Sequence, residues 1–141
     1  MLVARIWTTV NVVGRDAFEL AARAGDLDAL TSALAPDVAF RGPAFPDATV
    51  GRERVGAILA AAFGGVYEDF EYVDALSGAA RTVLLFNARV GDHQMEGAQV
   101  LGFNADDLVN ELVVMVRPAA AAAALGQAIL AALGIRSPNE V

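Results

Sequence analysis

Four stretches with β-strand character follow one another between Tyr67 and Pro118, and they constrain the fold more than any other feature of the sequence. They are residues 67–76, 81–90, 94–104 and 108–117. Each is rich in β-branched, leucine and aromatic residues, and turn residues or proline stand at the boundaries. Connections this short force neighbouring strands to run antiparallel, so the sequence predicts an antiparallel meander.

Both faces of the predicted sheet carry apolar side chains. In the third strand, Gln99, Leu101 and Phe103 share one face. Ala98 and Val100 lie on the other face of the same strand. A sheet that is apolar on both sides needs cover on both sides. We expect the chain's own helices to cover one face and a second subunit to cover the other, which predicts a homodimer.

Three helices are predicted before the meander, with a short strand at 38–41, and one helix is predicted after it. The helices span residues 16–24, 27–34, 51–63 and 119–134. Asp16 with Glu19 has the spacing of a capping box, and Asp26 and Thr49 are expected N-caps. Gly25 and Gly134 are the expected terminators, and Ala35-Pro36 is expected to end the second helix. Residues 42–47 are predicted to form an irregular loop.

Composition argues against several classes of function. The net charge of −7 disfavours nucleic acid and anionic membranes as partners. No apolar run reaches the roughly 18 residues of a membrane helix and no secretory signal is evident, so the expected location is cytoplasmic. With no cysteine and one histidine, neither a metal nor another cofactor is predicted. Charged residues are only 19% of the chain, which favours an apolar cavity or burial in an oligomer.

Several short motifs carry a family resemblance. They are AGDLDAL at 24–30, PDVAF at 36–40, GRERV at 51–55 and the pair Glu96-Gly97. With the order of elements, residues 16–118 resemble the SnoaL-like and ketosteroid-isomerase-like families of the nuclear transport factor 2-like superfamily. The resemblance implies an α+β cone: three N-terminal helices packed in a strongly bent antiparallel sheet, plus a C-terminal helix. It also implies an internal apolar pocket and dimerisation through the outer face of the sheet.

The resulting organisation is an N-terminal arm at 1–15, a SnoaL-like domain at 16–118, the C-terminal helix at 119–134 and a tail at 135–141. The superfamily includes isomerases, polyketide cyclases, epoxide hydrolases and proteins without catalytic activity. The fold therefore leaves open whether this chain is an enzyme.

The resemblance places three isomerase positions at Gly42, Phe18 and Gln99. Related isomerases have a carboxylate base at the first, a tyrosine at the second and a protonated aspartate at the third. The base and the tyrosine hydroxyl are absent here, so steroid-isomerase chemistry by that mechanism is excluded. The acid of the cyclases also falls at Gln99. Arg89 and Arg117 are expected on the outer face, so they do not form the inward charged set of the epoxide hydrolases.

Gln99 is therefore the best catalytic candidate, with two interpretations that remain open. Its amide either anchors a ligand carbonyl or hydroxyl, or bonds to a neighbouring strand or buried water, since a buried amide needs a partner in both cases. The predicted pocket residues are Phe18, Phe40, Ile58, Phe63, Phe86, Gln99, Leu101, Leu112, Val114 and Val116.

Other charged residues are expected to be structural. His93 is predicted to be a solvated residue at a hairpin tip. The acidic residues that begin at Glu68 are predicted to be a solvated strand edge. Arg41, Arg52 and Arg54 near the pocket mouth are expected to pair with Glu53 or Asp47.

The leading hypothesis is that the chain binds a small hydrophobic molecule with one polar group. If it also acts on that molecule, the expected chemistry is that of a metal-free isomerase, cyclase or hydrolase. The alternative is a non-catalytic accessory or dimerisation domain. An open cavity with Gln99 at its floor favours the first, and an interior filled by aromatic side chains favours the second.

Overall fold

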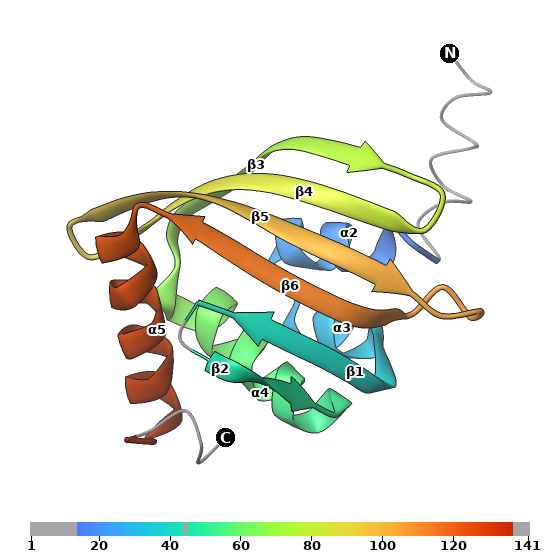
Figure 1. Cartoon of the computed structure of the whole chain (residues 1–141), viewed down its shortest axis with the longest axis horizontal. Helices are drawn as coiled ribbons and strands as arrows, with labels where there is room; N and C mark the ends of the chain where they lie inside the picture. The colour runs from blue at the N-terminus through green and yellow to red at the C-terminus, as the bar shows by residue number, and fades with distance from the viewer. Residues whose placement is uncertain (1–13, 44, 137–141) are drawn as a thin grey trace.

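The computed structural model describes residues 14–43 and 45–136, and a curved six-stranded sheet forms its centre (Figure 1). The strands are β1 (Leu34–Gly42), β2 (Phe45–Val50), β3 (Glu68–Ser77), β4 (Arg81–Val90), β5 (His93–Phe103) and β6 (Val109–Arg117). Their order across the sheet is β2-β1-β6-β5-β4-β3. Strands β3 to β6 pair antiparallel in chain order, which confirms the predicted meander. Strand β1 joins parallel to β6.

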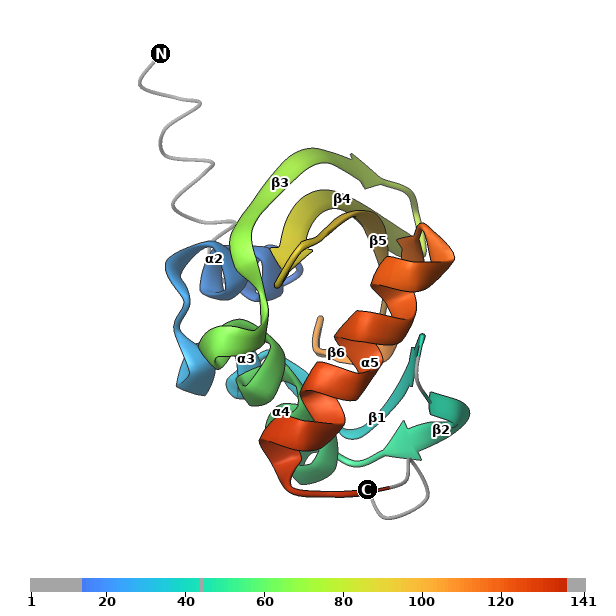
Figure 2. The same ribbon diagram turned by 90° about the vertical axis from the view of Figure 1, so that its left-hand side faces the viewer.

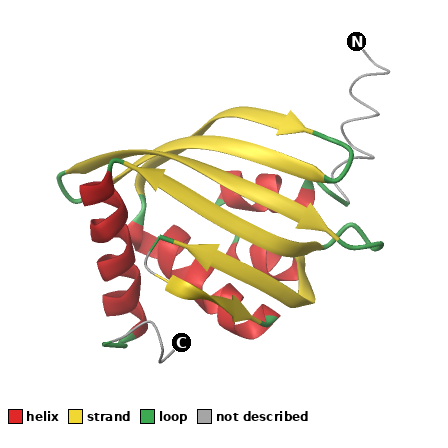
Figure 3. Ribbon diagram, in the orientation of Figure 1, coloured by secondary structure: helices red, strands yellow, loops and turns green. Residues whose placement is uncertain are grey.

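The helices are α2 (Ala17–Ala24), α3 (Leu27–Ser32), α4 (Arg52–Ala61) and α5 (Ala119–Leu133), and a π-helical turn at Ala62–Val66 continues α4. Helices α2 to α4 lie on one face of the sheet, here called the inner face (Figure 3). Helix α5 crosses the open end of the curved sheet and packs against α4, β5 and β6 (Figure 2). No helix within the described residues is long and apolar enough to cross a membrane.

The predicted caps at the α2–α3 junction and at the end of α5 are confirmed. Gly25 ends α2 in the left-handed conformation with φ of 65°, and Gly134 ends α5 in the same way. The Asp26 carboxylate accepts a hydrogen bond from the Ala29 N–H at 3.0 Å, as expected of an N-cap. The predicted capping box at Asp16 is wrong, because its side chain makes no capping bond. Glu19 instead pairs with Arg23, one helical turn later.

The second helix ends earlier than predicted, because its last residues pair with the sheet. It stops at Ser32, and Leu34 begins β1 opposite Val109. The Val109 N–H donates to the Ala33 carbonyl at 2.9 Å. Pro36 does not stop a helix but lies inside β1, where the register with β6 shifts between Leu34 and Ala39. A proline fits there because an irregular position in a strand needs no N–H donor.

The region predicted to be an irregular loop contains a sixth strand. Strand β2 pairs antiparallel with β1 and forms one edge of the sheet, with Pro46 exposed on it. Thr49 therefore lies in β2 opposite Phe40 and does not cap the third helix. Gly51 is the N-cap residue of α4 instead, without a side-chain bond. A proline on an edge strand is compatible with pairing on the other side, which sequence patterns alone did not reveal.

Alternation along the meander separates the two faces as predicted. The inner face of β4 to β6 is buried, and it carries Leu84, Phe86, Gln99, Leu101, Leu112 and Val114. The outer face carries no helix within the described residues, and its side chains are half-buried or exposed (Figure 3). The helices thus cover the inner face, and none of the described residues forms a layer over the outer face. Residues 1–13 of the predicted arm at 1–15, and residues 137–141 of the predicted tail, lie outside the described residues.

Candidate functional site

A small cavity lies on the inner face, between the sheet, α4, the π-helical turn and α5. Its volume is about 20 Å³, which is room for about one water molecule. Pockets for drug-sized ligands are typically about 300–1,000 Å³. The lining residues are Phe40, Pro43, Phe45, Ile58, Leu59, Ala62, Phe63, Tyr67, Gln99, Val114, Leu125, Gly126 and Ile129. The interior is therefore nearly filled, mostly by aromatic and aliphatic side chains.

The structure brings together half of the predicted pocket residues. Those that line the cavity are Phe40, Ile58, Phe63, Gln99 and Val114. Phe18, Leu101 and Leu112 are fully buried core residues away from the lining. Phe86 is also buried, and Phe86 and Val116 border a groove on the outer face. Helix α5 adds Leu125, Gly126 and Ile129 to the lining.

Gln99 is the central polar residue of the cavity. Its side chain is 1% exposed, and its neighbours across the strands are Leu84 and Val114. The Tyr72 hydroxyl lies 2.6 Å from Gln99 Oε1. This distance is typical of an O–H···O bond and short for N–H···O, so Tyr72 donates and the amide oxygen accepts. The amide NH₂ of Gln99 makes no hydrogen bond within residues 14–43 and 45–136 and remains free to donate.

Tyr72 and Tyr67 are both held in the neutral form. Burial raises the pKa of Tyr72, and the nearby Tyr67 raises it further. Burial also raises the pKa of Tyr67 well above its ordinary value. The Tyr67 hydroxyl makes no hydrogen bond to any described residue. At neutral pH, each tyrosine therefore keeps its proton and acts as a hydrogen-bond donor.

Tyr67 and Tyr72 belong to a cluster of five aromatic rings. The Tyr67 ring centroid lies 5.2 Å from that of Phe63, 5.0 Å from Phe70 and 5.7 Å from Phe86. Tyr72 joins the cluster through Phe70, at 4.9 Å. Most of these contacts are edge-to-face, the arrangement that aromatic pairs favour. The cluster fixes both tyrosines beside the cavity.

Neither tyrosine was among the predicted site residues, because strict alternation puts positions 67 and 72 on opposite faces of a strand. The first of two register shifts in β3, between Glu68 and Glu71, brings Tyr72 to the same face as Tyr67, opposite Phe86; the second shift comes after Tyr72, before Asp74. At the first, Asp69 takes a positive φ of 54°. The available signal was the aromatic spacing 67, 70 and 72, which fits a bulge and not a regular strand.

Among the residues that the structure describes, the cavity lining contains no carboxylate and no histidine. The position that the family resemblance assigns to the isomerase base is Gly42, and the Phe40 ring lies over it. A Cβ atom at Gly42 would be 2.6 Å from Phe40 Cζ, closer than real Cβ contacts. The lining therefore has donors that could hold an oxygen atom, but no group that removes a proton from carbon.

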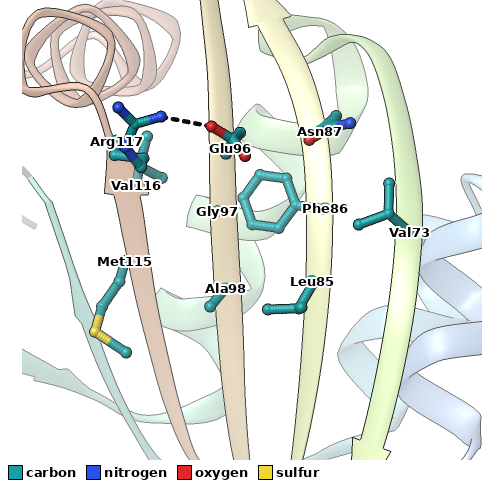
Figure 4. A pocket seen from close by; sticks show the side chains of 10 residues that line it. All are labelled: Val73, Leu85, Phe86, Asn87, Glu96, Gly97, Ala98, Met115, Val116 and Arg117. Carbon is teal, nitrogen blue, oxygen red and sulfur yellow. Dashed lines mark hydrogen bonds and ion pairs between the residues drawn. The ribbon is translucent and has the colours of Figure 1, made fainter.

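A larger groove lies on the outer face, over strands β3 to β6 (Figure 4). Its volume is about 420 Å³, and its floor is formed mainly by Val73, Leu85, Ala98 and Met115. Val73 and Met115 are each 54% exposed. The Glu96–Arg117 ion pair borders one end. This groove is apolar and lies on the opposite side of the sheet from the Tyr72–Gln99 pair.

The arginines have structural partners. Arg89 pairs with Asp69 and Glu68, so it points outward as predicted. Arg41 pairs with Glu111 and not with Asp47 or Glu53. Arg52 donates twice to the Leu34 carbonyl, at 2.9 and 2.6 Å, and so ties α4 to the start of β1.

His93 is exposed at the start of β5. Within the described residues, no group of three or more His, Asp or Glu side chains is arranged to hold a metal ion. The absence of a metal cofactor stays a prediction.

The curved sheet with helices on its inner face is the fold of nuclear transport factor 2-like proteins. The chain belongs to the SnoaL-like family: the SnoaL-like domain matches residues 15–112. Helix α5 lies beyond that match.

Solved structures support the same classification. A steroid delta-isomerase from Pseudomonas aeruginosa is 33% identical, with a TM-score of 0.78 over 83% of this chain and 86% of the other. An uncharacterised protein with a cystatin-like fold from Silicibacter pomeroyi is 27% identical, with a TM-score of 0.76 over 82% and 81%. A SnoaL-like protein of unknown function from Burkholderia thailandensis shares the fold at 21% identity, with a TM-score of 0.61 over 74% and 91%. No curated protein matches the chain.

Proposed function

We propose that the interior cavity binds a small apolar molecule through one acceptor oxygen, and that the chain does not by itself abstract a proton from it. The observation that carries this proposal is the orientation of Gln99. Because Tyr72 occupies the amide oxygen at 2.6 Å, the amide NH₂ is the group left for a ligand. A carbonyl oxygen, which can only accept, matches that donor, whereas a hydroxyl must also place its own proton, and Gln99 Oε1 is already shared with Tyr72.

Tyr67 supports the same assignment. It lines the cavity together with Gln99, and burial keeps its hydroxyl protonated. The hydroxyl has no hydrogen-bond partner within the described residues. Two neutral donors in an apolar chamber suit a ketone or ester oxygen, since such sites use few polar groups to fix orientation.

The ligand requires more room than the cavity has. The lining side chains that set its size are Phe40, Phe45, Phe63 and Ile129, and each of these is larger than a valine. Binding therefore includes a displacement of one or more of them. The similarity to a steroid delta-isomerase makes a steroid enone the appropriate first probe of a larger ligand.

The experiment compares a ketone with the alcohol of the same skeleton, in the parent protein and in Gln99→Leu. We expect the parent to bind the ketone more tightly, and Gln99→Leu to lose about 1–3 kcal/mol of ketone binding, the usual cost of a lost buried hydrogen bond. Mass spectrometry of ligands retained by the purified protein identifies natural candidates. Equal affinity for ketone and alcohol, or unchanged ketone binding in Gln99→Leu, would contradict the proposal.

A second candidate function is that of a non-catalytic dimerisation or accessory domain. The nearly filled interior favours it, as does the apolar groove on the outer face, where Val73 and Met115 are more than half exposed. Exposed apolar surface of this kind marks interaction sites. A homodimer through this face is compatible with ligand binding inside, because the two sites lie on opposite sides of the sheet.

A further inference from the structure

Phe63 and Tyr67 form a wall between the interior cavity and a groove on the surface. The groove has a volume of about 400 Å³ and lies between the end of α2 and β3. Arg23, Glu71 and Tyr72 are among the residues that border it. In the described part of the chain, Phe63 and Tyr67 are the residues that line both this groove and the 20 Å³ cavity. One layer of side chains therefore separates the interior from open space.

Apart from Pro43, the other residues that line the cavity are buried. On the α5 side, Leu125 is 1% exposed and Ile129 is 5% exposed, so further atoms cover them. Phe45 is 6% exposed at the β1–β2 end. Phe63 and Tyr67, in contrast, are only half-buried. The neighbouring Pro43 is also exposed, and it provides the alternative route that an experiment must separate.

Phe63 is better placed to move than Tyr67. It sits in the π-helical turn Ala62–Val66, and the next two residues are Gly64 and Gly65. A Cβ atom at Gly65 would meet nothing within 4 Å, so this part of the turn is loosely surrounded. The backbone bond from the Tyr67 N–H to the Ala62 carbonyl, at 2.8 Å, fixes the two ends of the turn. π-Helical turns inside or at the end of α-helices are frequent at functional sites.

Tyr67 is held more firmly. Its ring contacts Phe63, Phe70 and the fully buried Phe86, whereas Phe63 contacts only Tyr67 and Phe70 within the aromatic cluster. A rotation of Phe63 would therefore join the groove to the cavity and leave the Tyr67 hydroxyl in place.

We infer that the interior is reached through the α2–β3 groove and that the Phe63 ring is the gate. The inference rests on the proposed function, since it supplies the route and the outer part of the same ligand site. A ligand that passes Phe63 lies along the aromatic faces of Tyr67 and Phe70, so the fitting class is a flat apolar molecule. Its oxygen leads toward Gln99, and its far end stays near Arg23 and Tyr72.

The test needs no ligand, because the chain has no cysteine of its own. Val114→Cys places one thiol in the cavity lining, at a residue that is 8% exposed. The rate of its reaction with 4,4′-dithiodipyridine, a flat uncharged reagent, reports access to the interior. Phe63→Ala is added to this protein, and Phe45→Ala is the matched control because it removes the same side chain at the opposite end of the cavity.

We expect Phe63→Ala to accelerate the labelling of the introduced thiol by about tenfold or more, because the open state gains population. Phe45→Ala should change the labelling rate by less than about twofold. Phe63→Leu should give an intermediate labelling rate, and it replaces Phe63→Ala in the comparison if that variant fails to fold. Equal acceleration by the two alanine variants, faster labelling in Phe45→Ala, or rates that follow only the unfolding free energy of each variant would overturn the gate. A failure of the ketone and Gln99→Leu experiment concerns the proposed function alone, because thiol labelling uses no ligand.

Discussion

Removing the Tyr72–Gln99 hydrogen bond from either end should destabilise the protein, by amounts that depend on which group loses its partner. Tyr72→Phe leaves Gln99 Oε1 without its partner in a side chain that is only 1% exposed. An unsatisfied buried acceptor costs about 1–3 kcal/mol. Gln99→Leu leaves the hydroxyl of Tyr72 without its partner, but Tyr72 is only half-buried. The destabilisation should therefore lie toward the lower end of that range, and the added apolar contact should offset part of it.

The double variant separates the bond from the other effects of each substitution. In Tyr72→Phe with Gln99→Leu, neither polar group remains to be stranded, so the loss should be smaller than the sum of the single losses by about 1–2 kcal/mol. Urea unfolding with a fixed slope for all four proteins gives these free energies. Additive losses would show that the two side chains do not act as a pair and would remove the basis for the orientation of Gln99.

The raised pKa values of the two tyrosines predict that the protein loses stability at alkaline pH. Burial raises the pKa of Tyr67 and Tyr72 above the ordinary value of 10.0, so the unfolded chain releases protons that the folded chain keeps. The stability contributed by the neutral tyrosines is complete below about pH 10 and is lost as the pH rises further. We expect the free energy of unfolding to fall above that pH, and to fall less steeply in Tyr72→Phe. An identical slope in both proteins would contradict the burial argument.

Three further predictions concern the outer face, the core and the missing chemistry. Met115→Lys should weaken self-association by at least about 1–3 kcal/mol, since the interface would bury an unpaired charge, and sedimentation that shows only monomer for the parent protein would refute the dimer. Gly97→Ala should destabilise by about 1–3 kcal/mol because its Cβ would lie 2.2 Å from Phe86 Cζ, whereas Gly64→Ala, with its nearest neighbour at 3.7 Å, should be nearly neutral by thermal unfolding. Gln99→Asp alone should not turn over a steroid enone, and measured turnover would show that a base has been missed.

Elements with their own local signals could be predicted from the sequence. The meander followed from alternating β-formers and turn residues, and the Gly25-Asp26 junction followed from capping chemistry. The elements that were wrong depend on distant partners. Strand β1 begins at Leu34 because Val109 and Arg52 satisfy the backbone there, and β2 exists because β1 offers it an edge. No local pattern contains those contacts.

The candidate site was predictable only in part, for a related reason. Gln99 was found through the family resemblance, which places the isomerase and cyclase acid at that position, and its neighbours on the same strand face are apolar. Its partner Tyr72 was missed because the register shifts of β3 break the alternation on which face assignments depend. The bulge at Asp69 changes which face Tyr72 occupies, and the sequence shows such a bulge only through the unusual aromatic spacing.

The missing base and the filled interior are two consequences of one local arrangement. At Gly42, the absence of a side chain lets the Phe40 ring lie over the backbone, where a Cβ atom would be only 2.6 Å away. The same ring packs edge-on against Phe45 at 5.7 Å, and both line the cavity. A carboxylate at position 42 and this position of Phe40 are mutually exclusive. At this end of the cavity, apolar packing therefore occupies the space that a side chain at position 42 would need.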